Sequence, residues 1–578
     1  MENLTYSEIL QQNVALRKNL EANPGYKISV LSNIIVHQLK EIMEYDLRLE
    51  KINASLEFGD FDNIVQDSAK VEDSNAVVIF WELCNLVEGL YLKIEQLTEE
   101  RLEELVQKTC LEIDLTFRNL KSSSLVIFHK FTPSVFSFQA VPNSNLEVLA
   151  DRLNSFVVEN KPDNVILVNI EKVFNKIGLN RSVNFRHFYS SQALYSIDFF
   201  KNYAQLVKPI FTAANGKTKK ALIFDCDNTL WRGILGEDGF EKIQMSAHFS
   251  PGVIFHEIQS LAVALSRKGV LIGLCSKNNP GDVDQVVQEH PDMLIREEII
   301  TIKKVNWTDK AMNLRQIASD LNIGLDSIVF VDDSSFETNL IKEQIPEITV
   351  LQVPEKIYEY PDMLRSNLGL FFNNNVTQED LLKAKIYKEQ SEREDSKKSF
   401  SKIEDYLTSL DLSVKIFKDD RELIPRMSQL TQKTNQFNLT TKRYTDIDIQ
   451  GFVASGDYAV YAWSVSDKFG DNGLTGLSIV DLTKELLHID TFLMSCRIIG
   501  RNIEYKVMDY IIRDLRNTNY GSISAIYTAT PKNMQVAEFY ENCSFDKENG
   551  SDGAYKLNLD NYRESNINYI KIENGNKN

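Results

Sequence analysis

The sequence predicts an α/β protein built from about three domains, and three observations support this fold class. The chain has 578 residues, whereas one domain usually holds about 100–200. Between about residues 26 and 350, short apolar runs alternate with longer stretches of helical periodicity, a pattern typical of βα units and parallel sheets. Hydrophobic residues make up 43% of the chain and charged residues 25%, which is enough apolar material for several cores.

The first domain is expected over residues 1–215. Long amphipathic helices, notably over residues 95–113, separate four apolar runs there. This alternation predicts a doubly wound parallel sheet. Its expected strands are residues 27–31, 76–80, 124–129 and 164–169.

A second α/β domain is expected over residues 216–376, after a short basic polar joint. The helix-prone and densely charged stretch over residues 377–410 is typical of a solvated connecting helix. Five further apolar runs predict the strands of the second domain, at residues 221–224, 270–274, 298–302, 327–331 and 349–352.

A third, mixed α/β domain is expected over residues 411–560. Apolar runs at residues 458–465 and 488–493 predict strands, and residues 502–516 predict a helix. Residues 561–578 are rich in Asn, and we expect a flexible tail there.

Composition and charge exclude several classes of protein. A net charge of −18 and a pI near 5.1 disfavour nucleic-acid binding, which requires a basic surface. No run approaches the roughly 18 apolar residues of a membrane span, and the polar start does not resemble a signal peptide, so we expect a cytoplasmic protein. The six cysteines form no C-x-x-C pair and are expected to be free thiols without structural zinc: Cys84, Cys110, Cys226, Cys275, Cys496 and Cys543.

The strongest chemical signal is an apolar strand, residues 221–224, that runs into Asp225 and Asp227. Ligands of open α/β sheets bind at the carboxyl ends of the strands. There the pair suits a nucleophile, Asp225, beside a general acid and base, Asp227. Carboxylates close to a phosphate need a cation, and oxygen ligands favour Mg²⁺.

Three further signals follow predicted strands in chain order. Ser276 offers a hydroxyl to phosphate oxygens, Lys310 offers a cation near a helix start, and Asp332 with Asp333 ends another strand in carboxylates that can bind metal. Each alone has an ordinary structural alternative: a helix cap, a solvated lysine or a turn. Together they predict a site for phosphoryl transfer.

These four motifs resemble those of the haloacid dehalogenase (HAD) superfamily of aspartate-nucleophile phosphotransferases. The resemblance implies that Asp225 attacks phosphorus, that Asp227 protonates the leaving group and then activates water, and that Ser276 and Lys310 hold the phosphoryl group. The motif spacing leaves little room for a large cap domain, so a capless site is expected.

The same resemblance implies the metal ligands. Asp225 and Asp332 would hold Mg²⁺ through their carboxylates and Asp227 through its carbonyl oxygen. Asp333 would be an outer or alternative ligand.

The extended string at residues 225–239, DCDNTLWRGILGEDG, resembles the FkbH-like subfamily, HAD-IIIC. Residues 275–278 (CSKN) and 495–501 (SCRIIGR) are arranged as in that subfamily. The resemblance implies an enzyme that takes the glyceryl group from 1,3-bisphosphoglycerate, removes its phosphates and loads it on the phosphopantetheine arm of an acyl carrier protein. Thr229 and Asn278 are the expected substrate contacts.

Cys226, between the two aspartates, is the candidate for a covalent glyceryl tether. The resemblance suggests this role. Strand alternation argues against it, because Cys226 faces away if the two aspartates share a face. A buried cysteine is also often only a small apolar residue, so both alternatives remain open.

The flanking domains carry weaker resemblances. The first resembles an SGNH-hydrolase-like unit, but Leu31-Ser32-Asn33 replaces the expected Gly-Asp-Ser, and Asn184 stands where an aspartate would orient His187. We therefore expect a scaffold rather than a second hydrolase site.

The third domain resembles an acyl-CoA N-acyltransferase (GNAT) fold. Arg497, Gly500 and Arg501 precede the predicted helix, where backbone N–H groups and arginines could hold the phosphate of a phosphopantetheine arm. Asn502 stands where that fold expects Gly or Ala. A plain strand-to-helix turn is the alternative.

Three functions are therefore weighed. The first is an Mg²⁺-dependent phosphatase and glyceryl transferase acting on a phosphorylated three-carbon substrate for a carrier protein, in polyketide or surface-glycan synthesis. The second is a phosphatase for a small metabolite. The third is a non-catalytic adaptor that docks a carrier protein, which the complete set of four motifs disfavours.

Overall fold

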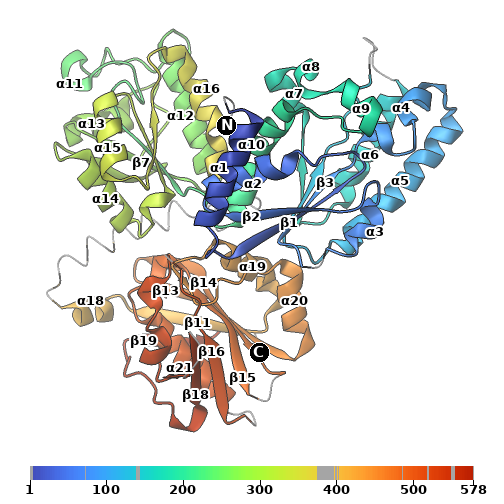
Figure 1. Cartoon of the computed structure of the whole chain (residues 1–578). Helices are drawn as coiled ribbons and strands as arrows, with labels where there is room; N and C mark the ends of the chain where they lie inside the picture. The colour runs from blue at the N-terminus through green and yellow to red at the C-terminus, as the bar shows by residue number, and fades with distance from the viewer. Residues whose placement is uncertain are drawn as a thin grey trace. The chain divides into compact units, whose positions relative to one another are not determined.

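A computed structural model gives the structure of the chain. It describes residues 4–71, 73–137, 144–373, 400, 402–483, 486–516, 520–530, 532–548 and 553–576, together with residues 389, 393 and 396. The chain separates into two compact units, Met1–Asn215 and Gly216–Asn578 (Figure 1). Most of the predicted connecting helix over residues 377–410 lies outside the described residues.

The first unit contains a five-stranded sheet in which every pair of neighbouring strands is parallel. The strand order is β2-β1-β3-β4-β5, and the sheet confirms the predicted α/β class. Its strands are β1 (Gly25–Ser32), β2 (Asn53–Phe58), β3 (Ala76–Phe80), β4 (Val126–His129) and β5 (Val165–Val168).

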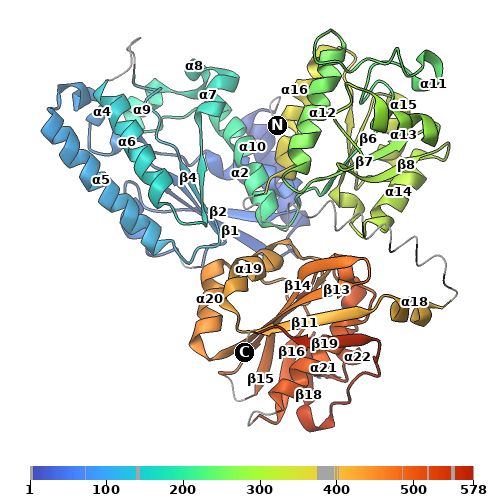
Figure 2. The ribbon, with the colours of Figure 1, turned by 180° about the vertical axis from the view of Figure 1, so that it is seen from behind.

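Helices cover this first sheet because its strands are apolar on both faces. Helices α5 and α6 pack against one face through their apolar sides (Figure 2). The helices of the unit are α1 (Tyr6–Asn19), α2 (Leu39–Leu49), α3 (Ile64–Ser68), α4 (Leu90–Lys93), α5 (Glu99–Asn119), α6 (Asn145–Asn160), α7 (Glu171–Ile177), α8 (Leu179–Ser182), α9 (Phe185–Ser191) and α10 (Ile197–Ala214).

The second unit contains a second parallel sheet, in the order β10-β9-β6-β7-β8. The first strand in the chain, β6, therefore lies at the centre, beside β9 and β7. The five strands are β6 (Ala221–Phe224), β7 (Leu271–Ser276), β8 (Ile300–Val305), β9 (Ile328–Asp332) and β10 (Thr349–Gln352).

The second sheet has a separate apolar core on each face. Helices α12, α13 and α16 bury their apolar sides on one face, and α14 and α15 on the other. Helices α12, α13, α14 and α15 each run back between two parallel strands of this sheet, so their N-termini lie at its carboxyl edge. The helices are α11 (Leu235–Asp238), α12 (Gly252–Ser266), α13 (Pro280–Glu289), α14 (Lys310–Asp320), α15 (Ser335–Gln344) and α16 (Tyr360–Ser366).

The third sheet is mixed, in the order β17-β18-β16-β15-β14-β13-β11-β19, and β12 pairs with β15. Its strands are β11 (Leu412–Lys418), β12 (Phe437–Asn438), β13 (Tyr458–Asp467), β14 (Gly470–Asp481), β15 (Leu487–Met494), β16 (Ser522–Ile526), β17 (Asp546–Lys547), β18 (Ala554–Asn558) and β19 (Ile570–Asn574). Its helices are α18 (Ile403–Ser409), α19 (Ile424–Lys433), α20 (Asp446–Ser455), α21 (Ile503–Leu515) and α22 (Phe539–Asn542).

The C-terminal residues differ from the expected flexible tail. Strand β19 pairs in parallel with β11, Leu412 facing Ile570 and Val414 facing Ile572. The pairing occurs because β11 is the open edge of the sheet and Ile570 can bury its side chain there. Among the described residues, no helix combines the length and the apolar composition that crossing a bilayer requires.

Candidate active site

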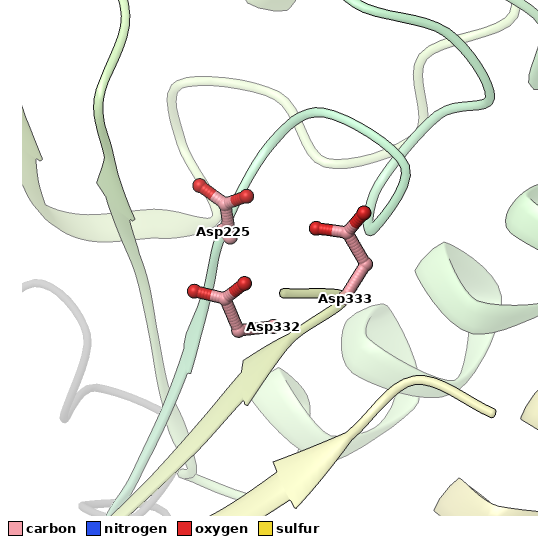
Figure 3. Close-up of side chains that lie close together, drawn as sticks. All are labelled: Asp225, Asp332 and Asp333. Atoms are coloured by element: carbon pink, nitrogen blue, oxygen red, sulfur yellow. The ribbon is translucent and has the colours of Figure 1, made fainter. Parts of the chain in front are cut away.

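Three aspartates converge at the carboxyl edge of the second sheet (Figure 3). Strands β6 and β9 are paired in register up to Phe224 and Val331, so Asp225 and Asp332 follow side by side. One carboxylate oxygen from each of Asp225, Asp332 and Asp333 lies within 4.8 Å of the others. Asp225 and Asp332 are buried and Asp333 is half-buried. The fold thus holds three carboxylates close enough to share a cation.

Lys310 places one positive charge against this cluster. It is the first residue of α14, and Asp309 caps that helix by accepting a hydrogen bond from the Met312 N–H. Its Nζ lies 2.7 Å from Asp332 Oδ2 and 3.2 Å from Asp225 Oδ1. Burial opposes its charge, but Asp225 and Asp332 together raise the pKa of Lys310, so it stays a cation.

The buried carboxylates are short of positive charge. Burial raises the pKa of Asp225, while Lys310 and the hydroxyl of Ser276 oppose that rise. Burial and the neighbouring Asp225 likewise raise the pKa of Asp332. Within the described residues, no hydrogen bond reaches Asp225 Oδ1. One lysine therefore does not neutralise the cluster.

Ser276 and Asn278 come from the strand on the other side of β6. Ser276 ends β7 and Asn278 follows it; both side chains are buried. Asn278 Nδ2 donates to Asp227 Oδ2 at 2.8 Å. The structure therefore brings these two predicted residues to the same edge as the aspartates.

Asp227 is half-buried and has a different environment from Asp225. Its Oδ1 accepts hydrogen bonds from the Trp231 indole N–H at 2.9 Å and from the Leu235 backbone N–H at 3.0 Å. The sequence reasoning assigned no role to Trp231. The only available signal was its place in the extended motif, because a single indole donor leaves no periodic pattern.

Two predicted residues at this edge point into the protein. Thr229 is fully buried, and its carbonyl accepts a hydrogen bond from Tyr360, so contact between its side chain and a substrate stays a prediction. Cys226 packs in the core with Leu222 and Phe224. Burial and the charge of Asp225 raise the pKa of its thiol, which leaves little of the nucleophilic thiolate.

The first unit places Ser32 and His187 in ordinary structural positions. The Ser32 hydroxyl donates to the Ile34 carbonyl. His187 lies in α9, and its backbone N–H donates at 3.2 Å to the side chain of Asn184, the N-cap of that helix. Asn184 thus caps a helix, and the predicted scaffold role stays a prediction.

The arginines proposed to hold a phosphopantetheine phosphate are committed to the protein's own chain. Arg501 is 5% exposed and donates to Asp467 at 3.0 Å and to the carbonyl of Arg497 at 2.8 Å. Arg393 also binds Asp467, through two hydrogen bonds. Arg497 is also buried, and its Nε donates to the Ser495 hydroxyl at 3.2 Å. Gly500 is exposed, but the two arginines beside it already have partners.

The strand edge next to these arginines is also occupied. Strand β15 pairs in parallel with β16 only over Leu487–Ile489. Beyond that, β12 takes the open edge: Phe437 faces Met494, and the Leu439 N–H donates to the Phe492 carbonyl. Over Phe437–Leu439 the edge of β15 is therefore taken by the protein's own chain, and docking of a pantetheine arm in this domain stays a prediction.

Comparison with known proteins supports a phosphatase domain. No protein-family model matches the chain, and no curated protein matches it by sequence. A solved structure, the N-terminal part of BF1531 from Bacteroides fragilis, contains a phosphatase domain complexed with Mg. It is 25% identical, covers 64% of this chain and 100% of that chain, and has a TM-score of 0.56.

Two acetyltransferase structures match a smaller share of the chain. A putative acetyltransferase of the GNAT family from Desulfovibrio desulfuricans is 15% identical and covers 25% of this chain and 99% of that chain, with a TM-score of 0.19. An aminoglycoside acetyltransferase, AAC(6')-Ib in complex with coenzyme A, is 14% identical and covers 25% of this chain and 94% of that chain, with a TM-score of 0.20.

Proposed function

We propose that the chain is an Mg²⁺-dependent phosphatase of the HAD superfamily, with Asp225 as the nucleophile. The observation that carries this proposal is the convergence of Asp225, Asp332, Asp333 and Lys310 at one edge of a parallel sheet. The similarity to a phosphatase domain solved with Mg supports the same reading.

The carboxylate cluster fits a divalent cation. Oxygen donors are the ligands that Mg²⁺ prefers, and Asp225 Oδ1 is buried without a hydrogen bond in the described part of the chain. Asp225 and Asp332 would hold the ion, with Asp333 as the third carboxylate and the Asp227 carbonyl as a further donor. Bound there, Mg²⁺ supplies positive charge beside the phosphoryl oxygens.

The residues of the site divide the reaction into two steps. Asp225 attacks phosphorus and the bond to the leaving oxygen breaks, while Asp227 gives that oxygen a proton. Ser276 and Lys310 orient the phosphoryl group, the former by its hydroxyl and the latter by its charge. Asp227 then removes a proton from water, and the water oxygen displaces Asp225, which releases phosphate.

From the resemblance to FkbH-like proteins, we further propose glyceryl transfer from 1,3-bisphosphoglycerate to an acyl carrier protein. The carrier thiolate attacks the acyl carbon and displaces the acyl phosphate, and the phosphatase site hydrolyses the remaining 3-phosphate ester. A protein-borne substrate needs an open site with a surface around it. Within residues 216–373, seven large apolar side chains are exposed, and each lies in a segment after a strand or at a helix start, at the carboxyl edge. They are Ile234, Phe249, Val253, Trp307, Met312, Phe336 and Tyr358.

The burial of Cys226 favours direct transfer to the carrier over a tether on that thiol. A buried thiol with a raised pKa attacks an acyl phosphate poorly. The proposal therefore needs no covalent glyceryl intermediate on Cys226.

The test is intact mass spectrometry of a holo carrier protein incubated with the enzyme, MgCl₂ and freshly generated 1,3-bisphosphoglycerate. A glyceryl adduct is expected with the wild type and with Cys226→Ala, and a phosphoglyceryl adduct with Asp225→Asn. Phosphate release without any adduct would leave a phosphatase for a small metabolite. Transfer itself releases the acyl phosphate, so the nucleophile is tested by the adduct: a glyceryl adduct without phosphate formed by Asp225→Asn would overturn the assignment of the nucleophile.

A further inference from the structure

The carboxylate of Asp227 is held by three hydrogen-bond donors from two different segments. Trp231 Nε1 and the Leu235 backbone N–H donate to Oδ1 at 2.9 and 3.0 Å, and Asn278 Nδ2 donates to Oδ2 at 2.8 Å. Trp231 is fully buried and Asn278 is 4% exposed. We call these three donors the Asp227 clamp.

The turn that carries Trp231 is itself fixed to the core. Its start is a tight reversal in which Asn228 adopts a positive φ of 50° and the Leu230 N–H donates to the Cys226 carbonyl at 2.8 Å. Gln259 of α12 then donates to the Leu230 carbonyl at 2.8 Å. Tyr360 of α16 donates to the Thr229 carbonyl at 3.2 Å.

The segment that supplies the Leu235 N–H is fixed in a similar way. Asp238 Oδ2 accepts the Ile234 N–H at 2.8 Å, and Asn228 Oδ1 accepts the Gly233 N–H at 3.1 Å. The donors around Asp227 are therefore attached to rigid backbone, which is what orienting a reacting group requires.

The two oxygens of Asp227 are not equivalent in this clamp. A carboxylate oxygen accepts about two hydrogen bonds, so Oδ1, with two donors, is filled. Oδ2 has one donor, Asn278, and one remaining acceptor site. Oδ2 is thus the oxygen that can exchange a proton with a bound substrate.

We propose that Trp231 and Asn278 are positioning residues that hold Asp227 with Oδ2 directed to the leaving group and then to water. The proposal rests on the proposed phosphatase function. In the first step, the proton on Oδ2 goes to the leaving oxygen as its bond to phosphorus breaks. In the second, Oδ2 takes a proton from water as the water oxygen bonds to phosphorus and the Asp225–phosphorus bond breaks.

The kinetic test compares two phosphate esters in Trp231→Phe, which keeps a buried aromatic ring and removes the indole donor. With glycerol 3-phosphate, whose alkoxide needs a proton, we expect kcat to fall about 10- to 100-fold, since general acid–base catalysis contributes about 10²–10⁴-fold. With p-nitrophenyl phosphate, whose phenolate leaves without one, attack by Asp225 stays fast. Water activation then becomes limiting, so we expect a burst of about one p-nitrophenolate per enzyme.

Tyr360→Phe is the matched control. It removes one buried hydrogen bond from the same turn, at the Thr229 carbonyl, and leaves all three donors to Asp227 in place. We expect it to keep the wild-type ratio of rates on the two esters, without a burst. Asn278→Ala removes the donor to Oδ2 and is expected to reproduce the burst with p-nitrophenyl phosphate if Trp231→Phe does not fold.

A second readout does not depend on turnover. The chain contains four tryptophans, so the indole N–H resonance of Trp231 can be assigned by its loss in Trp231→Phe. We expect this resonance to move upfield in Asp227→Ala, because its acceptor is removed.

The outcomes separate the clamp from the function on which it rests. If Trp231→Phe gives no burst with p-nitrophenyl phosphate, or if Tyr360→Phe gives the same burst, the positioning role is overturned. If the wild type hydrolyses neither ester, the proposed function fails. In that case an unchanged indole resonance in Asp227→Ala would also overturn the clamp.

Discussion

Replacing Lys310 by Met is expected to destabilise the protein strongly when no metal is present. The Lys310 ammonium lies 2.7 Å from Asp332 and 3.2 Å from Asp225, and the three side chains are 0–8% exposed. Removing one partner of a buried ion pair costs about 3–5 kcal/mol, because a buried charge is left uncompensated. At about 2–4 °C per kcal/mol for a domain of 150–250 residues, the size class of the expected domain over residues 216–376, the unfolding midpoint should fall by roughly 6–20 °C.

The assay is thermal unfolding of the purified protein in EDTA and in excess MgCl₂. In EDTA the full loss is expected for Lys310→Met. In MgCl₂ much of it should be recovered, since a bound ion at 100 times its Kd stabilises by about 2.7 kcal/mol and replaces the missing charge. Activity should stay low in both conditions, because the lysine also orients the phosphoryl group.

Lys303→Met is the matched control for this variant. Lys303 also binds two carboxylates, Asp284 at 2.6 Å and Glu297 at 2.8 Å, but both of these are more than 40% exposed. Exposed pairs contribute about 0–1 kcal/mol, so we expect a small loss that MgCl₂ does not change. A wild-type midpoint for Lys310→Met in EDTA, or an equal loss for Lys303→Met, would refute the reasoning from burial.

Two further predictions concern the third sheet. Burial raises the pKa of Glu504 to about 7, whereas the unfolded state releases this proton near pH 4.5. The free energy of unfolding is therefore expected to fall by about 3 kcal/mol as the pH rises from 4.5 to 7. In Glu504→Gln this pH dependence should disappear, and urea unfolding at pH 5 and pH 8 measures it. The same change in the free energy of unfolding between the two pH values in the wild type and the variant would contradict the prediction. Arg501→Ala should cost about 2 kcal/mol by removing a hydrogen bond to buried Asp467, whereas Arg513→Ala, at an exposed pair with Glu564, should cost under about 1 kcal/mol.

The strands that position the site could be predicted because they are continuous apolar runs. Residues 221–224 and 349–352 form β6 and β10 with the expected bounds, and β9 differs from its prediction by one residue at each end. The sequence reasoning missed β2, whose alternating burial at the sheet edge leaves polar residues in the run. It also missed β14, which contains Gly470, Gly473 and Gly476.

The carboxylates of the site could be placed from sequence for a related reason. Asp225 and Asp332 each follow an apolar run, and parallel strands end at the same edge of a sheet. The partners of those side chains could not be predicted, because they are chosen by packing between distant segments. Asn278 donates to Asp227 across 51 positions of the chain, and Arg501 reaches Asp467 across 34. No local pattern records either pairing.

The environments of Asp225 and Asp227 support the different roles proposed for them. Asp225 is buried against the Lys310 ammonium and two further carboxylates, so its carboxylate lies where the proposed metal and a phosphorus atom would meet. Asp227, two residues later, is half-buried and held by three uncharged donors, with one acceptor site left on Oδ2. The proposed transfer of a proton to the leaving oxygen and from water needs a carboxylate oxygen held in one place, and the three donors provide this by fixing Oδ2. Exchanging the two surroundings would leave the proposed nucleophile without a carboxylate partner for a metal and the proposed acid and base without its orienting donors, so each position after β6 suits only its own step.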